Sequence, residues 1–296
     1  MIKKDRLDML LVDRGLAETL PKAQAMIMAG LVFHGQERLD KAGRMVPVDL
    51  PLTVEKPLPF VGRGGLKLEE ALEVFKIEVE GRICTDIGSS TGGFTDCLLK
   101  RGAAKVFAVD VDIRQLDVRL RADPRVVTIE KNARYLEPGD FAETPSLVVM
   151  DVSFISVLKV MPAIVRILGT HRQHSTDKIP IAESDRVDNP ELGSVSPIQK
   201  PIQPILLSLV KPQFEAEKGQ IGEKGLVRDP AVHRDVLAHI ARGAADLGFR
   251  LHGLMRCSTR GQKGNQEFFG LWTPGGEPPA EEAVAIWIEA AVRDAP

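Results

Sequence analysis

The sequence predicts an α/β protein, in which a mostly parallel sheet with helices on both faces follows a small α+β domain. From residue 66 onward, short apolar runs typical of buried strands alternate with segments of helical periodicity. The last two apolar runs have no helix between them, which predicts a hairpin that closes the sheet with an antiparallel last strand. Residues 5–30 differ, because they hold two short amphipathic helices.

Composition places the chain among soluble globular proteins. Of its 296 residues, 44% are hydrophobic and 27% are charged, which is ordinary for that class. No apolar stretch is long enough to cross a bilayer, and the N-terminus MIKKDRLDM lacks the apolar core of a secretory signal. Cys84, Cys97 and Cys257 are odd in number and widely spaced, which favours a reducing compartment and offers no metal-ligand spacing. We therefore expect a cytoplasmic protein with no metal site and no membrane partner.

The first 60 residues predict the small domain. Leucines at helical spacing followed by Gly15 indicate a first helix. Thr19 is a suitable N-cap for a second helix with Pro21 in its first turn, and Gly30 ends that helix. The segments GLVFHGQ and PLTVEK then indicate two strands.

A basic cluster accompanies these helices. Residues 1–67 hold 11 Lys and Arg against 8 Asp and Glu, a charge of +3, so the other 229 residues carry −5 of the total of −2. A basic domain ahead of an acidic body is typical of nucleic-acid binding. The candidate RNA contacts are Lys3, Lys4, Arg6, Arg14, Lys22 and Arg63. A solvated charged face is the alternative interpretation.

Proline, glycine and polar stretches set the other boundaries. EKPLPFVGRGG indicates a linker, with residues 61–65 between the small domain (1–60) and a large domain (66–273). Residues 169–203 have few apolar side chains and no periodicity, which predicts a mobile insertion. Residues 274–296 form a linker and a short helix, whose expected packing face is Val284, Ile286, Trp287 and Ile288.

Seven strands are expected in the large domain after the helix LKLEEALEVF. Five apolar runs indicate parallel strands, and two more form the closing hairpin. In chain order they are ICTDIG, KVFAVDVD, VVTIEKN, SLVVMDVSF, PILLSLVK, FRLHGLMRCS and QEFFGLWT.

The segment CTDIGSSTGGFTDCLL joins the first of these strands to a helix. Its small residues let a ligand lie against the backbone, and its spacing fits neither a dinucleotide fingerprint nor a phosphate-binding loop. Asp86 suits a ligand with an ammonium group, and Asp110, at the next strand end, suits ribose hydroxyls. These features point to S-adenosylmethionine, with a structural turn in another doubly wound fold as the alternative.

Lys211 follows a buried strand, at the edge where open α/β sheets bind ligands, and Pro212 fixes the backbone after it. Asp151 ends another strand at that edge, Lys67 comes from the first helix, and Glu267 starts the last strand. Burial and a second cation nearby would favour a neutral lysine, able to take a proton from a sugar hydroxyl that attacks a methyl group. By spacing alone, scattered surface ion pairs are an equal alternative.

The motifs resemble two known families. RLDMLLVDRGLAETLPKAQAMIMAGLVFHG is similar to the S4-type RNA-binding domain, with Leu20-Pro21-Lys22 in place of the usual Ser-Arg pair. GRGGLKLEEALEVF, DIGSSTGGFTD, VVMDVSFIS, LVKPQFEAEKGQIG, GLVRDP and GNQEFF resemble the TlyA family, also called hemolysin A. The methyltransferase domain of that family is similar to the FtsJ/RrmJ-type ribose 2′-O-methyltransferases.

This resemblance implies a Rossmann-like class I fold that uses S-adenosylmethionine to methylate a cytidine ribose 2′-hydroxyl in ribosomal RNA. The partner would be the large ribosomal subunit, with the small subunit as a further acceptor, and the chain would be a monomer. The family's Lys-Asp-Lys-Glu tetrad falls on Lys67, Asp151, Lys211 and Glu267, and its cofactor site on Asp86, Gly88, Ser89, Gly92, Gly93, Phe94 and Asp110.

Two other functions stand beside this one. A non-catalytic RNA-binding assembly factor would bind RNA without methyl transfer, and the complete tetrad argues against it. The hemolysin name implies membrane activity, but the tail helix carries Glu281, Glu282 and Glu289, which anionic lipid would repel. Because the catalytic motifs hold no tyrosine or tryptophan, we expect no aromatic platform at the site and specificity for RNA shape instead.

Overall fold

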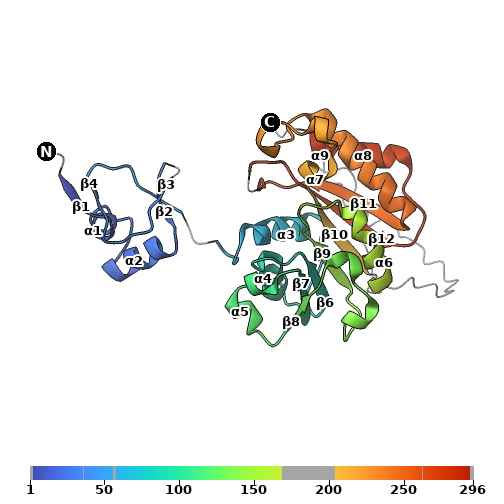
Figure 1. Cartoon of the computed structure of the whole chain (residues 1–296), viewed down its shortest axis with the longest axis horizontal. Helices are drawn as coiled ribbons and strands as arrows, with labels where there is room; N and C mark the ends of the chain where they lie inside the picture. Colours follow the sequence, from blue (N-terminus) through green and yellow to red (C-terminus); the bar gives the residue numbers. More distant parts are fainter. Residues whose placement is uncertain (1–2, 36, 56–57, 169–203, 262, 294–296) are drawn as a thin grey trace. The chain divides into compact units, whose positions relative to one another are not determined.

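The computed structural model describes residues 3–35, 37–55, 58–168, 204–261 and 263–293 (Figure 1). The chain divides into two compact units, Met1–Pro59 and Phe60–Pro296. The insertion expected at residues 169–203 lies outside the described residues.

The described residues of the small unit form two helices and five short strands. The helices are α1 (Leu7–Asp13) and α2 (Leu20–Met28), and the strands are β1 (Lys4–Arg6), β2 (Val32–His34), β3 (Glu37–Arg38), β4 (Met45–Pro47) and β5 (Thr53–Val54). β2 pairs with β3 and β5, and β1 pairs with β4, all antiparallel. Both expected helices and strands are present. β1, β3 and β4 add to them, because two or three residues are too few to show an alternation.

Local sequence explains where these helices begin and end. The Thr19 side chain accepts a hydrogen bond from the backbone N–H of Lys22, as an N-cap does. Gly15 follows α1 with φ of +69°, and the N–H of Leu16 bonds to the carbonyl of Leu11 at 2.9 Å. This left-handed glycine closes the helix and turns the chain toward α2.

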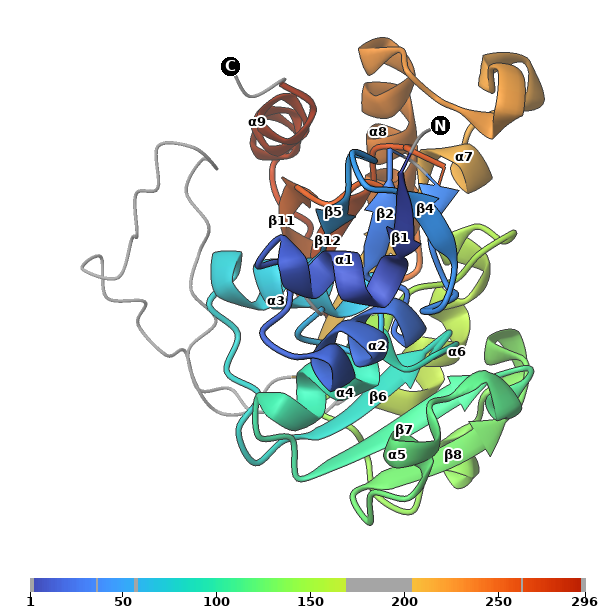
Figure 2. The same cartoon turned by 90° about the vertical axis from the view of Figure 1, so that its left-hand side faces the viewer.

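The large unit holds a seven-stranded sheet in the order β11-β12-β10-β9-β6-β7-β8. The strands are β6 (Ile83–Ile87), β7 (Lys105–Asp110), β8 (Val126–Glu130), β9 (Leu147–Met150), β10 (Ile205–Val210), β11 (Phe249–Arg256) and β12 (Phe268–Pro274). β12 runs antiparallel to β10 and β11, and the pairs among β10, β9, β6, β7 and β8 are parallel. Figure 2 shows β6, β7 and β8 side by side at one end. The expected mixed sheet with its closing hairpin is confirmed.

Helices cover both faces of this sheet. They are α3 (Arg63–Val74), α4 (Gly93–Lys100), α5 (Val118–Arg121), α6 (Met161–Leu168), α7 (Pro212–Glu215), α8 (Pro230–Asp246) and α9 (Glu281–Val292). Successive strand residues point to opposite faces. In β9, Leu147 and Val149 join the core with α3 and α4, whereas Val148 and Met150 join the core with α6 and α8. In the central strands β9 and β10 every residue is buried, which is why these strands are almost wholly apolar.

Two expectations change, one about the end of the linker and one about the packing face of α9. α3 begins at Arg63, so the end of the expected linker is the first turn of a helix, and the backbone N–H of Val61 bonds to Asp96 at 2.9 Å. A Cβ on Gly65 would overlap the ring of Phe60, so this glycine serves close packing rather than flexibility. In α9, Ile286 is 58% exposed, because residues at spacings of three and four share a face and Ile286 does not lie on it. The buried residues of α9 are Trp287, Ile288, Ala291 and Val292.

Candidate active site

The expected cofactor loop connects β6 to α4. Gly88 has φ of +83°, and a Cβ there would overlap the carbonyl oxygen of Asp151. Gly92 has φ of +98°, and a Cβ there would overlap a methyl group of Leu120. Glycine alone satisfies both the backbone conformation and the space. The loop therefore lies directly against the residue that follows β9.

Asp86, near the end of β6, is fully buried. Its Oδ2 accepts hydrogen bonds from the backbone N–H of Thr95 at 2.9 Å and from the Thr95 hydroxyl at 2.7 Å. Its Oδ1 and the Ser89 hydroxyl oxygen are buried without a hydrogen-bond partner among the described residues. Burial raises the pKa of Asp86 to about 7. Because buried polar atoms are rarely left unpaired, these two oxygens fit a polar ligand such as the ammonium of an aminoacyl group.

Asp110 ends β7 beside the loop. Its carboxylate accepts hydrogen bonds from the backbone N–H groups of Ser90 at 2.9 Å and of Asp112 at 3.1 Å. Ser90 has φ of +46°, which is uncommon for a residue other than glycine. Asp110 thus holds the loop in its unusual shape. A carboxylate has about four lone pairs, so it keeps capacity for ribose hydroxyls.

Gly93 and Phe94 begin α4 and differ in what they offer a ligand. The Phe94 ring is 3% exposed and lies 5.9 Å from the ring of Phe269, between their centroids. Its side chain therefore belongs to the core, and only its backbone N–H, in the first turn of the helix, is available to a cofactor. At Gly93, a Cβ would lie 3.0 Å from the backbone nitrogen of Gly65, so this glycine lets α4 approach α3 closely.

Lys211 and Asp151 form an ion pair at the carboxyl edge of the sheet. They follow β10 and β9, which are parallel neighbours, so both side chains start from the same edge. Lys211 Nζ lies 2.5 Å from Asp151 Oδ1, and it donates a hydrogen bond to the Ser153 hydroxyl at 2.9 Å. The Asp151 N–H bonds to the carbonyl of Ile87 at 2.9 Å. This pair is therefore tied to the strand that carries the cofactor loop.

Lys67 and Glu267 form a second ion pair at the same edge. Lys67 Nζ lies 2.5 Å from Glu267 Oε2, and the side chains are 10% and 4% exposed. In the antiparallel β10–β12 pair, Val210 lies opposite Phe268, so the flanking Lys211 and Glu267 leave the sheet at one edge. Each lysine of the expected tetrad thus has its own carboxylate, Glu267 for Lys67 and Asp151 for Lys211. Both pairs are largely buried, unlike scattered surface pairs.

Phe154 is an exposed aromatic residue near the Lys211–Asp151 ion pair that sequence patterns did not single out. It lies three residues after Asp151, is 90% exposed and has φ of +64°. Its ring lies 5.0 Å from the ring of Phe214, and Lys211 Nζ lies 5.9 Å from the Phe214 centroid. An exposed aromatic side chain therefore lies near Lys211, although the sequence predicted no aromatic platform there. The available signal was the aromatic residue in VVMDVSFIS, directly after a strand end.

Two of the candidate RNA contacts hold the small unit together. Arg6 donates hydrogen bonds to both carboxylate oxygens of the buried Asp8, at 3.0 and 2.7 Å, and this guanidinium holds the pKa of Asp8 well below its usual range. Arg14 donates hydrogen bonds to the carbonyl oxygens of Leu50, at 2.6 Å, and of Val48. These bonds occupy much of both guanidinium groups.

The other candidates are more accessible. Lys22 pairs with Glu18 one helical turn away, and the side chains are 61% and 79% exposed. Lys3, Lys4 and Arg63 are exposed and have no ion pair with any residue that the structure describes. These four cations are the ones available to RNA phosphates.

The described residues show neither a membrane-spanning helix nor a metal-ligand cluster. Across the described part of the chain, no helix is long and apolar enough to cross a bilayer. The same part contains no group of three or more His, Cys, Asp or Glu side chains arranged to hold a metal ion. The three cysteines are buried, and burial raises the pKa of Cys84 to about 12, so its thiol stays protonated.

The strand order, the antiparallel last strand and the glycine loop after the first strand of the large unit define a class I methyltransferase. The glycines and the two unpaired buried oxygens of this loop fit S-adenosylmethionine, the methyl donor of that class. The chain belongs to the FtsJ-like methyltransferase family, whose model matches residues 60–272, and residues 5–50 match the S4 domain.

Relatives match the chain over nearly its whole length. YqxC of Bacillus subtilis is 43% identical over 97% of this chain and 94% of its own length. The 16S/23S rRNA (cytidine-2′-O)-methyltransferase TlyA of Mycobacterium tuberculosis is 41% identical over 92% of this chain and 90% of its own length. The solved structure of a Streptococcus thermophilus protein called a hemolysin is 38% identical with a TM-score of 0.66, and the match covers 98% and 96% of the two chains. The expected resemblance to the TlyA family is confirmed.

Proposed function

We propose that the chain methylates the 2′-hydroxyl of a cytidine ribose in ribosomal RNA with S-adenosylmethionine as donor. The observation that carries this proposal is the Lys211–Asp151 pair, held at the carboxyl edge and tied to the cofactor loop through Asp151. The S4 domain supports an RNA substrate, and the name of the M. tuberculosis relative supports the cytidine 2′-hydroxyl.

The chemistry follows from the side chains at this edge. S-adenosylmethionine, when bound, supplies a methyl group on a positively charged sulfur. Lys211 Nζ, once deprotonated, would take the proton of the 2′-hydroxyl, so that the ribose oxygen could accept the methyl group that the donor supplies. Asp151 and Ser153 hold the amine in position. The Lys67–Glu267 pair, at the same edge of the sheet, orients the acceptor ribose.

The cofactor contacts would come from the first two strands of the large unit. Asp86 Oδ1 and the Ser89 hydroxyl would bind the aminoacyl end, because both are buried and lack a partner among the described residues. Asp110 would accept hydrogen bonds from the cofactor ribose. Gly88 and Gly92 would let the ligand lie against the backbone.

RNA would be held by phosphate contacts and by stacking. Lys3, Lys4, Lys22 and Arg63 would contact phosphates, which position the RNA without reading its sequence. Phe154 would stack on a base turned out of the RNA, next to Lys211. We further propose that the acceptor is an assembled ribosomal subunit, the large one with the small one as a further acceptor, and that the chain acts as a monomer in the cytoplasm.

Mapping of 2′-O-methyl groups on ribosomal RNA, from cells with and without this protein, tests the proposal. We expect one or more cytidines to lose the modification in its absence and to regain it when purified subunits are incubated with protein and donor. Identical maps would overturn the proposed function. Equal methylation rates on a synthetic hairpin and on a subunit would instead overturn the requirement for an assembled substrate.

A further inference from the structure

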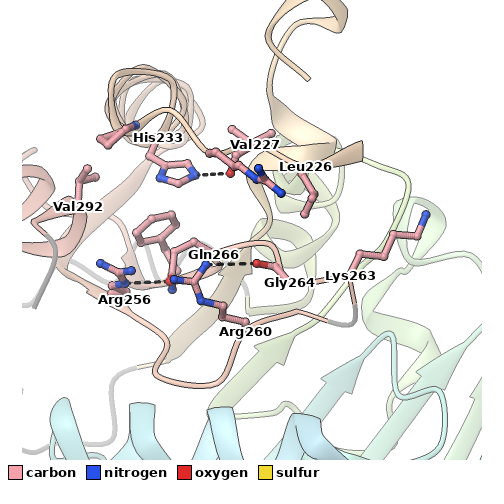
Figure 3. Close-up of a pocket in the computed structure, with 12 residues that line it drawn as sticks. Leu226, Val227, His233, Arg256, Arg260, Lys263, Gly264, Gln266 and Val292 are labelled. Atoms are coloured by element: carbon pink, nitrogen blue, oxygen red, sulfur yellow. Dashed lines mark hydrogen bonds between the residues drawn. The ribbon is translucent and has the colours of Figure 1, made fainter. Parts of the chain in front are cut away.

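A cavity of about 320 Å³ opens beside the end of β11, apart from the two ion pairs (Figure 3). Its walls come from the loop before α8, the first turns of α8, the β11–β12 loop and the end of α9. None of the tetrad residues lines it. Its cationic lining residues are Arg228, Arg256, Arg260 and Lys263.

The charge of this cavity is one-sided. No aspartate or glutamate is among the described residues that line it. Arg228, Arg260 and Lys263 are exposed and form no ion pair with any described residue. By contrast, Arg101 on α4's C-terminal side pairs with Glu69 at 2.6 Å. Cations that surround one cavity without paired carboxylates favour the binding of an anion there.

Part of the cavity wall is fixed in place. Gln266 is 5% exposed; its Oε1 accepts a hydrogen bond from Arg256 Nε at 2.8 Å, and its Nε2 donates to the Cys257 carbonyl at 2.8 Å. The ring of the buried His233 lies 3.1 Å from the Val227 carbonyl oxygen, between hydrogen-bonding atoms (Figure 3). A ligand would therefore meet a wall that is already ordered.

The β11–β12 loop connects this cavity to the catalytic edge. Arg260 and Lys263 lie on the loop, and the N–H of Cys257 bonds to the carbonyl of Glu267 at 2.9 Å across its base. A Cβ on Gly261 would overlap the carboxylate of Glu267, so the loop backbone lies against the Lys67–Glu267 pair. An anion held by Arg260 and Lys263 would thus lie on the loop that flanks the Lys67–Glu267 pair.

We propose that this cavity binds a backbone phosphate of the RNA strand that carries the acceptor ribose. The inference rests on the proposed function and adds a second anchoring point for its substrate. A phosphate presents oxygens in the geometry that a guanidinium binds with two hydrogen bonds. Such a contact positions the strand and carries no sequence information.

The test compares two double variants of the full-length chain with equal changes in charge. Arg260→Gln with Lys263→Gln alters the cavity. Lys105→Gln with Arg125→Gln alters the opposite, amino edge, where these cations pair with Glu143 and Asp123. Binding to labelled ribosomal RNA is measured on filters over a range of salt concentrations, after circular dichroism has shown that both variants are folded.

The cavity variant should bind about tenfold more weakly, and its log affinity should depend on log salt with a slope shallower by about one. The amino-edge variant should match the wild type. Arg260→Lys with native Lys263 should keep the wild-type slope, because the charge remains. Equal slopes for the two double variants would overturn the phosphate site.

Turnover separates this proposal from the proposed function. With methyl transfer measured on subunits, the cavity variant should raise KM about tenfold and leave kcat nearly unchanged, as loss of uniform binding does. RNA binding needs no turnover. If the slopes of the cavity variant and the wild type differ but the wild type does not methylate RNA, the proposed function alone is overturned. Methyl transfer together with equal slopes would overturn the phosphate site alone.

Discussion

The ion pairs at the carboxyl edge of the sheet differ from the Lys22–Glu18 pair of the small unit in their exposure to water. Lys67 and Glu267 have side chains that are 10% and 4% exposed, whereas Lys22 and Glu18 are 61% and 79% exposed. An exposed pair contributes little to stability. A buried pair loses hydration that its own attraction often fails to offset. The edge pairs are therefore better explained by chemistry than by stability, and the small-unit pair by solubility or RNA contact.

Replacement of Lys211 should produce the largest effect. Lys211→Ala removes the proposed base, and we expect methyl transfer to fall about 10²- to 10⁴-fold while S-adenosylmethionine binding stays nearly unchanged. Lys211→Arg should be equally inactive, because arginine keeps the charge but does not give up its proton. Labelled methyl incorporation and calorimetric cofactor binding measure the two quantities. Lys105→Ala, at the amino edge, serves as the control, and near-normal turnover of Lys211→Ala would remove this residue from the mechanism.

Breaking the second pair should lower stability as well as activity. Lys67→Met leaves Glu267 buried without its cation, and we expect the free energy of unfolding to fall by about 3 kcal/mol. Lys67→Met combined with Glu267→Leu should recover most of that loss, because no buried charge remains, yet methyl transfer should stay absent. Urea denaturation and labelled methyl incorporation give the two readouts. A stable and active double variant would show that the pair is only structural.

Replacement of Phe154 tests whether the exposed aromatic ring near the Lys211–Asp151 pair binds RNA. Phe154→Ala removes the proposed stacking surface, and we expect RNA affinity to fall about tenfold. Stability should change little, because the ring is 90% exposed. Phe154→Tyr should retain wild-type RNA affinity. Loss of thermal stability in Phe154→Ala, without loss of RNA affinity, would assign the ring to the fold.

The cofactor site should depend on pH through Asp86. Its pKa is raised to about 7 because the side chain is buried. The charged carboxylate attracts an ammonium more strongly, so S-adenosylmethionine should bind a few-fold more tightly as the pH rises from about 6 to about 8. Asp86→Asn should show no such dependence. A wild-type affinity that is flat over this range would mean that Asp86 does not meet the ammonium.

Folding stability should change with pH in the opposite direction. An acid whose pKa is raised in the folded state binds its proton more tightly there than in the unfolded chain. The contribution of Asp86 is therefore fully present below about pH 4 and is lost as the pH rises through about 7. Denaturation of wild type and Asp86→Asn at several pH values measures the difference. A gap between them that does not vary with pH would contradict this assignment.

The exposed pair of the small unit should give the smallest effect. Lys22→Ala should leave the thermal midpoint unchanged, because both partners are largely hydrated. If Lys22 contacts a phosphate, the salt dependence of RNA binding should become shallower by about one unit. Glu18→Gln removes the pair but keeps the cation, so its salt dependence should match the wild type. An unchanged slope of log affinity against log salt in Lys22→Ala would show that Lys22 is only a solvated charge and does not contact RNA.

Sequence alone determined the elements and much of the site. Apolar runs and helical spacing predicted the seven strands of the sheet and the two helices of the small unit, and Gly15 and Thr19 marked helix ends. These signals are local, because capping and periodicity depend on residues a few positions apart. Family motifs supplied the four residues of the proposed tetrad, although not the way they pair.

Tertiary structure decided which side chains meet. Lys67 and Glu267 are 200 positions apart in sequence, and the packing of α3 on the sheet brings them together. The order of strands places Asp151 beside Lys211, so each lysine has its own carboxylate. The same packing turned the Phe94 ring into the core and left Phe154 in solvent, although both are phenylalanines in site motifs. Burial, charge pairing and the basic cavity depend on contacts between distant segments, which no local pattern of residues encodes.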